Sequence, residues 1–146
     1  MKLIMENWKK FLNETATFRD PNFDFEWDEA RVHHSEDFPT KDVWMELSSK
    51  GQAVDAAALA GKINNTQYSD SCEHMEEEYQ HMTPDRQERV AAMFKSGDIE
   101  LPIVKKKGNQ YTLIAGNTRL TMMGRQRCKN PNFPVKVWVI DLGDTQ

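Results

Sequence analysis

The chain has 146 residues, of which 38% are hydrophobic and 29% are charged, and its formal net charge is −4. A chain of this length is expected to form one domain with a sizeable core. No apolar run approaches the roughly 18 residues of a membrane span, and Glu6 interrupts the apolar opening too early for a signal peptide. We therefore expect a soluble, cytoplasmic protein with no membrane partner.

Charge is distributed unevenly along the sequence. From Asp98 onward eight Lys and Arg residues accompany four acids, a balance of +4, whereas the preceding residues contain 11 bases and 19 acids, a balance of −8. A basic C-terminal part suits an anionic ligand. The overall acidity argues against strong nonspecific DNA binding, which normally uses many phosphate contacts.

The two cysteines, Cys72 and Cys128, lie far apart in the sequence. They lack the Cys-x-x-Cys spacing of metal or redox motifs, and the chain shows no secretory context. We therefore expect two free thiols.

The N-terminal third mixes helical and extended patterns. Residues 1–14 carry a single apolar stripe and predict an amphipathic helix. Residues 15–28 contain a proline and scattered aromatics without a clean period, which indicates an extended linker, and residues 30–35 predict a short strand. His33 and His34 would then point to opposite faces of that strand, which does not favour a shared metal ion.

Two packing helices are expected next. Thr40 is a typical N-cap and Gly51 a typical stop, so the first helix lies between them. The Ala-rich run Val54 to Ile63 predicts the second. We interpret residues 1–66 as a helical and extended region that packs on a core formed by residues 67–146.

Residues 71–81 predict an acidic helix with one candidate metal site. His74, Glu78 and His81 would share a helical face, and such spacing can present ligands to a divalent metal. The alternative is a solvated acidic helix whose apolar side packs inward. No additional general base or second-shell partner accompanies the three residues, so we assign no metal ligand.

The C-terminal part predicts a helix, a hairpin, a second helix and a last strand. Thr83 and Pro84 begin the first helix and Gly97 ends it. Residues 103–105 and 111–114 are β-rich runs on either side of a turn that contains Gly108. An alternating strand follows at 135–140, so the expected fold class is α+β with a small mixed sheet.

The turn after the hairpin is the main candidate site. Ala115 and Gly116 permit a sharp turn, and either Asn117 or Thr118 is a natural N-cap for the helix that continues to about Arg127. A strand that turns into a helix directs the unpaired N–H groups of the first helical turn at whatever lies beyond the strand. The expected ligand is an anion such as phosphate, with Thr118 and Arg119 as further donors.

This region resembles a known superfamily. The Pro-Ile-Val strand at 102–104 and the turn Gly116-Asn117-Thr118-Arg119 before a helix resemble the ParB/sulfiredoxin-like superfamily, often called ParB-like nuclease domains, over residues 84–141. The resemblance implies a small mixed sheet with helices, here with a helical N-terminal extension, and a turn that binds the phosphates of a nucleotide. The opening residues also look similar to those of small phage proteins.

The turn differs in two ways from the corresponding turns of the superfamily that it resembles. Sulfiredoxins place a reactive Cys where this chain has Asn117, so that redox chemistry is not expected. ParB proteins have an acid in the turn that helps to hold a metal ion, and a neutral Asn is a poorer Mg²⁺ ligand than a carboxylate.

We therefore expect a domain that binds a nucleotide or another phosphate ligand, with or without Mg²⁺. Hydrolysis of that ligand and nuclease activity on nucleic acid are the two candidate reactions. Catalysis would rest on Arg119 and on Glu100, with Asp98 as the alternative carboxylate, since phosphoryl transfer depends mostly on positioning and charge. The alternative is a noncatalytic module that retains the fold and binds a protein partner. The expected ligand-binding residues are Gly116, Asn117, Thr118, Arg119 and Lys105, with Lys107 as the alternative to Lys105.

Overall fold

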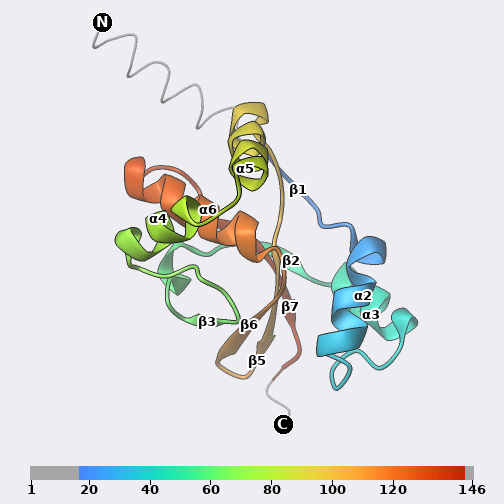
Figure 1. Ribbon diagram of the computed structural model, residues 1–146. Coiled ribbons are helices and arrows are strands. Elements are labelled where there is room, and N and C mark those ends of the chain that lie inside the picture. The colour runs from blue at the N-terminus through green and yellow to red at the C-terminus, as the bar shows by residue number, and fades with distance from the viewer. Residues whose placement is uncertain (1–16, 144–146) are drawn as a thin grey trace, which may run out of the picture.

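The computed structural model describes residues 17–143. The helix predicted over residues 1–14 lies outside the described residues. The fold is α+β, built on a five-stranded mixed sheet with the strand order β2-β7-β5-β6-β3 and a separate parallel pair of β1 with β4 (Figure 1).

The strands and helices follow in chain order. The strands are β1 (Thr17–Arg19), β2 (Gln52–Asp55), β3 (Ile63–Asn64), β4 (Asp98–Glu100), β5 (Ile103–Lys107), β6 (Gln110–Ala115) and β7 (Lys136–Asp141). The helices are α2 (Phe23–His33), α3 (Lys41–Ser49), α4 (Cys72–Gln80), α5 (Pro84–Ser96) and α6 (Asn117–Lys129), with a 3₁₀ turn at Ala57–Leu59.

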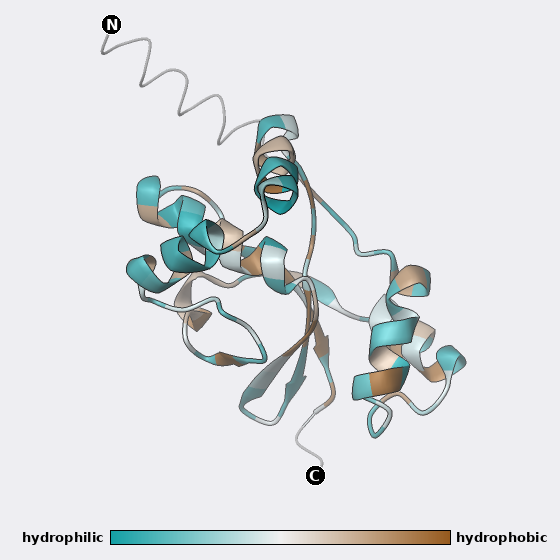
Figure 2. Cartoon of the chain, viewed as in Figure 1, coloured by the Kyte–Doolittle hydropathy of each residue, from teal (hydrophilic) through white to brown (hydrophobic). Residues whose placement is uncertain are grey.

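The sheet is buried on both faces by two hydrophobic clusters. Val137 and Val139 of β7 pack with α4 and α6 on one face, whereas Ile140 of the same strand packs with α2 and α3 on the other. This division follows from the alternation of side chains along a strand. Figure 2 shows β5 and β6 changing from hydrophobic to hydrophilic toward their shared hairpin, while α4 and α5 are largely hydrophilic.

Several predicted elements are confirmed. Thr40 and Thr83 cap α3 and α5 by accepting hydrogen bonds from backbone N–H groups three residues on. Gly97 ends α5 in the left-handed conformation, with φ 71°. The hairpin of β5 and β6 turns through Gly108, with φ 62°.

The prediction that an extended linker continues to residue 28 and is followed by a strand at 30–35 was wrong. The structure has the short strand β1 followed by α2, in place of an extended linker and a strand at 30–35. Asn22 caps the helix, accepting a hydrogen bond from the N–H of Phe25 at 3.1 Å. Phe23, Trp27 and Ala30 then recur at helical spacing and pack toward the sheet.

The prediction of a helix over residues 54–63 was also wrong. This segment forms β2, the 3₁₀ turn and β3. β2 pairs antiparallel with β7, and β3 pairs parallel with β6. Pairing along both edges of the sheet overrides the helix propensity of alanine, and the sheet therefore includes strands from both sides of residue 66.

The helices α4 and α6 pack closely together. Arg125 forms an ion pair with Glu76 and lies 3.8 Å from the ring centroid of Tyr79. Hydrogen bonds from Arg125 and from Gln80 lower the pKa of Glu76 to about 2. A Cβ on Gly124 would lie 2.6 Å from the Met75 sulfur, so this glycine permits the close approach.

A disulfide bond joins the same two helices. Cys72 of α4 and Cys128 of α6 are covalently linked, with Cα atoms 5.9 Å apart. The expectation of two free thiols was therefore wrong. Sequence spacing gave no sign of the pairing because the contact arises only when α4 packs on α6.

We expect the double variant Cys72→Ser/Cys128→Ser to lose up to about 4 kcal/mol of unfolding free energy, since the bond closes a loop between residues 56 positions apart. Urea denaturation measures this loss. Dithiothreitol should destabilise the wild type similarly and leave the double variant unchanged. Alkylation of two thiols in unreduced, unfolded wild-type protein would contradict the prediction.

Candidate functional site

The N-terminus of α6 begins at a left-handed glycine. Gly116 has φ 96° and ψ 30°, and no side chain caps the helix. A Cβ at this position would lie 2.9 Å from Pro102, so both the backbone conformation and the available space require glycine. The N–H groups of the first turn are thus left without a side-chain acceptor.

The two residues that were expected to cap α6 do not do so. The side-chain oxygen of Asn117 accepts hydrogen bonds from the Thr66 hydroxyl at 2.7 Å and from the N–H of Gln67 at 3.0 Å. The Thr118 hydroxyl accepts a hydrogen bond from Arg86 at 2.7 Å. Both side chains are held by neighbouring segments and turned away from the helix N–H groups.

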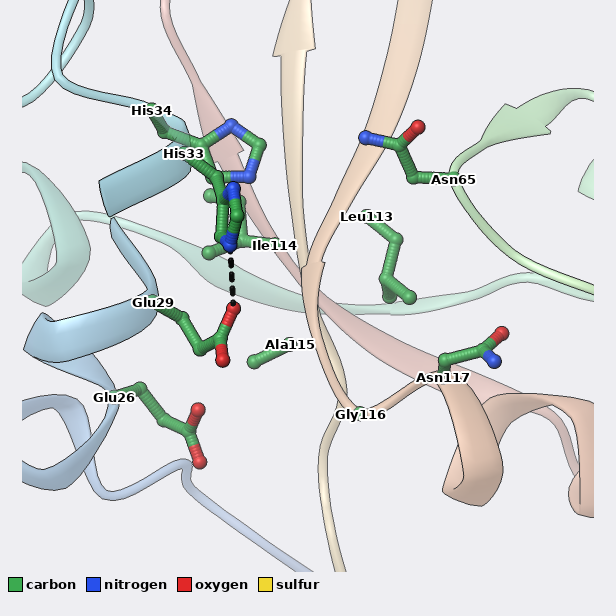
Figure 3. A pocket seen from close by; sticks show the side chains of 10 residues that line it. All are labelled: Glu26, Glu29, His33, His34, Asn65, Leu113, Ile114, Ala115, Gly116 and Asn117. Carbon is green, nitrogen blue, oxygen red and sulfur yellow. Dashed lines mark ion pairs between the residues drawn. The ribbon is translucent and has the colours of Figure 1, made fainter. Parts of the chain in front are cut away.

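A cleft of about 550 Å³ lies beside this turn. Figure 3 shows α2 on one side and the end of β6 with the α6 N-terminus on the other. An apolar stretch of β6 lies between the two walls. The lining residues are Glu26, Glu29, His33, His34, Asn65, Leu113, Ile114, Ala115, Gly116 and Asn117.

The wall formed by α2 is acidic. The side chain of Glu26 points into the cleft (Figure 3) and the residue is only 8% exposed. Its carboxylate accepts no hydrogen bond and forms no ion pair with any residue between 17 and 143. Burial raises the pKa of Glu26, although the charge of Arg119 acts in the opposite direction.

Two histidines and a second glutamate complete this wall. Glu29 lies 3.8 Å from the His33 ring (Figure 3). His34 is buried, and burial together with the nearby Lys105 charge lowers its pKa, which favours the neutral ring. The sequence prediction placed these histidines on opposite faces of a strand, whereas the end of α2 brings both to one cleft.

Arg119 lies behind the turn. Its side chain is 26% exposed, and its Nη2 atom is 3.6 Å from a carboxylate oxygen of Glu100. Nη2 also lies 2.8 Å from where a Cβ on Gly116 would be. Nε and Nη2 are buried without a hydrogen-bond partner among the described residues, so the guanidinium adds positive charge next to the turn but does not line the cleft.

The remaining predicted residues lie outside the cleft. Glu100 accepts a hydrogen bond from Arg19 at 2.8 Å and is shared between that residue and Arg119. Lys105 donates a hydrogen bond to Asp37 at 2.6 Å. Burial alone would raise the pKa of Asp37, but hydrogen bonds from Lys105 and Lys107 outweigh it and lower that pKa.

Two residues of the candidate metal site on α4, His74 and His81, contact other groups of the chain. His74 is 2.7 Å from the side-chain oxygen of Gln67, and His81 is 2.8 Å from the carbonyl oxygen of Glu77. Over residues 17–143 no group of three His, Cys, Asp or Glu side chains is arranged to hold a metal ion.

Sequence reasoning missed Glu26 and Glu29, which line the cleft, and Arg86, which contacts the first turn of α6. Arg86 comes from the first turn of α5, and its reach to Thr118 depends on how α5 packs beside α6. Glu26 was missed because its segment was interpreted as a linker. The Asn22 cap and the helical spacing that follows it were the signals that could have placed Glu26 on a helix.

No family model, curated protein or solved structure gives a significant match to this chain. The candidate site is therefore defined by the geometry of the chain itself. Among the described helices, none combines the length and hydrophobicity that crossing a bilayer requires.

Glu26 makes stability depend on pH. Its folded-state pKa is raised above 4.5, so its contribution is fully present below the unfolded-state pKa and is lost as the pH rises through the folded-state pKa. We expect Glu26→Gln to become more stable relative to the wild type as the pH rises from 4 to 8.

Urea denaturation across that pH range measures the difference. The exposed Glu36→Gln is the control for the loss of one carboxylate. A stability difference between wild type and Glu26→Gln that stays constant with pH would contradict the buried, unpaired environment of Glu26.

Proposed function

We propose that this protein binds a phosphate-bearing small molecule, a nucleotide, in the cleft between α2 and α6. The observation that carries the proposal is the uncapped N-terminus of the 13-residue helix α6 at the wall of a cleft of about 550 Å³. Backbone N–H groups at a helix N-terminus bind phosphate because they are unpaired donors and lie at the positive end of the helix dipole.

Residues around the turn support the same ligand. The charge of Arg119 lies directly behind Gly116, and its buried nitrogens lack hydrogen-bond acceptors among the described residues. Arg86 contacts the first turn of α6 through Thr118, outside the cleft. Two cations thus flank the first turn of α6, where a phosphate would bring its negative charge.

The size and lining of the cleft favour a nucleotide over free phosphate. Small-molecule pockets typically measure about 300–1,000 Å³ and combine apolar walls with a few polar groups. Leu113, Ile114 and Ala115 form an apolar floor between the two polar walls. Mg²⁺ would enter with the nucleotide phosphates, since such sites usually hold the ion through phosphate oxygens and one or two carboxylates.

The geometry supports binding more directly than turnover. Glu100, the expected catalytic carboxylate, is shared by two arginines and does not line the cleft. Release of inorganic phosphate, or cleavage of DNA or RNA, would add hydrolase or nuclease activity to this proposal.

A protein-binding role is the second candidate. Phe25 and Val32, seven residues apart on α2, are 74% and 57% exposed. Large apolar side chains on one exposed helix face are typical of a surface that binds a partner. This role predicts no response to nucleotides.

We expect Asn117→Asp to abolish nucleotide binding while leaving the protein as stable or more stable. The substitution keeps the side-chain shape, and the three groups that contact this oxygen are all donors. A carboxylate at a helix N-terminus typically stabilises by about 0.3–1 kcal/mol, but it repels a phosphate at the same place.

Thermal shift and calorimetry with ADP, GDP, CDP and UDP, with and without Mg²⁺, measure both effects. Nucleotide at 100 times its dissociation constant should stabilise the wild type by roughly 2.7 kcal/mol. Asn22→Asp is the matched control, because it makes the same change at the cap of α2 outside the cleft. Binding that survives in Asn117→Asp would contradict the proposed site.

A further inference from the structure

We propose that the cleft selects a guanine nucleotide and that the carboxylate of Glu26 recognises the guanine base. This inference rests on the proposed function, since it places the phosphates at the N-terminus of α6. It assigns the opposite wall of the cleft to the base.

Glu26 is a mostly buried acid whose carboxylate has no hydrogen-bond or ion-pair partner among the described residues. The residue is only 8% exposed, and its carboxylate points into the cleft (Figure 3). It has neither a hydrogen bond nor an ion pair with any part of the chain that the structure describes. The Glu26 carboxylate oxygens are not among the buried side-chain atoms that lack a partner, so they are open to the cleft, where a ligand can reach them. A ligand in the cleft can supply the missing donors.

The chemistry of a carboxylate defines those donors. An ionised carboxylate has two acceptor oxygens and no donor, and it pairs best with two parallel N–H groups. Guanine presents two adjacent N–H donors, at N1 and N2, on its pairing edge. Adenine and cytosine present one donor beside an acceptor, and uracil presents one donor between two acceptors. Guanine is therefore the base that matches Glu26.

The two walls of the cleft fit the two ends of this ligand. The α6 N-terminus supplies unpaired donors on one wall, and Glu26 supplies unpaired acceptors on the other. The apolar residues of β6 between them can pack against the ribose and the base. A guanine nucleotide has acceptors at its phosphate end and donors at its base edge, which is the complementary arrangement.

Calorimetry with GDP, ADP, CDP and UDP tests the inference. The wild type should bind GDP most tightly. Glu26→Gln should lower the affinity for GDP roughly tenfold to hundredfold, which is the range expected for hydrogen bonds to a charged group. Gln presents one acceptor and one donor, so the same variant should bind ADP or CDP as tightly as the wild type or more tightly. Pyrophosphate, which lacks a base, should bind both proteins equally.

Glu36→Gln is the matched control, because it also removes one carboxylate, but Glu36 is exposed and does not line the cleft. It should leave the preference for GDP in place. Equal binding of all four nucleotides, or a GDP affinity that Glu26→Gln does not reduce, would overturn the assignment of Glu26 and leave the proposed function standing. If neither the nucleotides nor pyrophosphate bind the wild type, both the proposed function and the assignment of Glu26 are overturned.

Discussion

The turn at Gly116 is the constraint on which the candidate site depends. The left-handed backbone there changes the direction of the chain from β6 into α6, and Pro102 leaves no room for a side chain. Without a side chain, residue 116 cannot cap the helix, and Asn117 and Thr118 are held by other segments. The turn therefore leaves the helix N–H groups available at the edge of the cleft.

Packing on the two faces of the sheet places the acidic side chain of Glu26 across the cleft from the N-terminus of α6. The clusters that bury the sheet fix α6 on one face and α2 on the other. The α2 helix packs through Ala30 and its aromatic residues, and this orientation directs Glu26 toward the end of β6. A cleft with donors on one wall and acceptors on the other follows from how the helices pack.

The sequence predicted one wall of the cleft and missed the other. The hairpin, Gly116 and α6 depend on local rules of turns and helix ends, which a sequence displays directly. The α2 wall depends on tertiary packing. In the sequence, the spacing of Phe23, Trp27 and Ala30 was obscured by Phe25, an exposed aromatic residue between them. The edge strands β2 and β3 and the disulfide were missed for the same reason, since each requires a partner distant in the sequence.

The charged groups without hydrogen bonds at this place support a binding function. Nε and Nη2 of Arg119 are buried without hydrogen bonds to the described residues, and the Glu26 carboxylate lies close enough for the Arg119 charge to lower its pKa, while it stays open to the cleft. An unsatisfied buried polar group costs roughly 1–3 kcal/mol, which is a substantial fraction of the stability of a small domain. A core arranged for stability alone would bring the two groups together as a hydrogen-bonded pair or replace them with apolar residues. Keeping them apart, on either side of the turn, leaves each able to interact with a ligand.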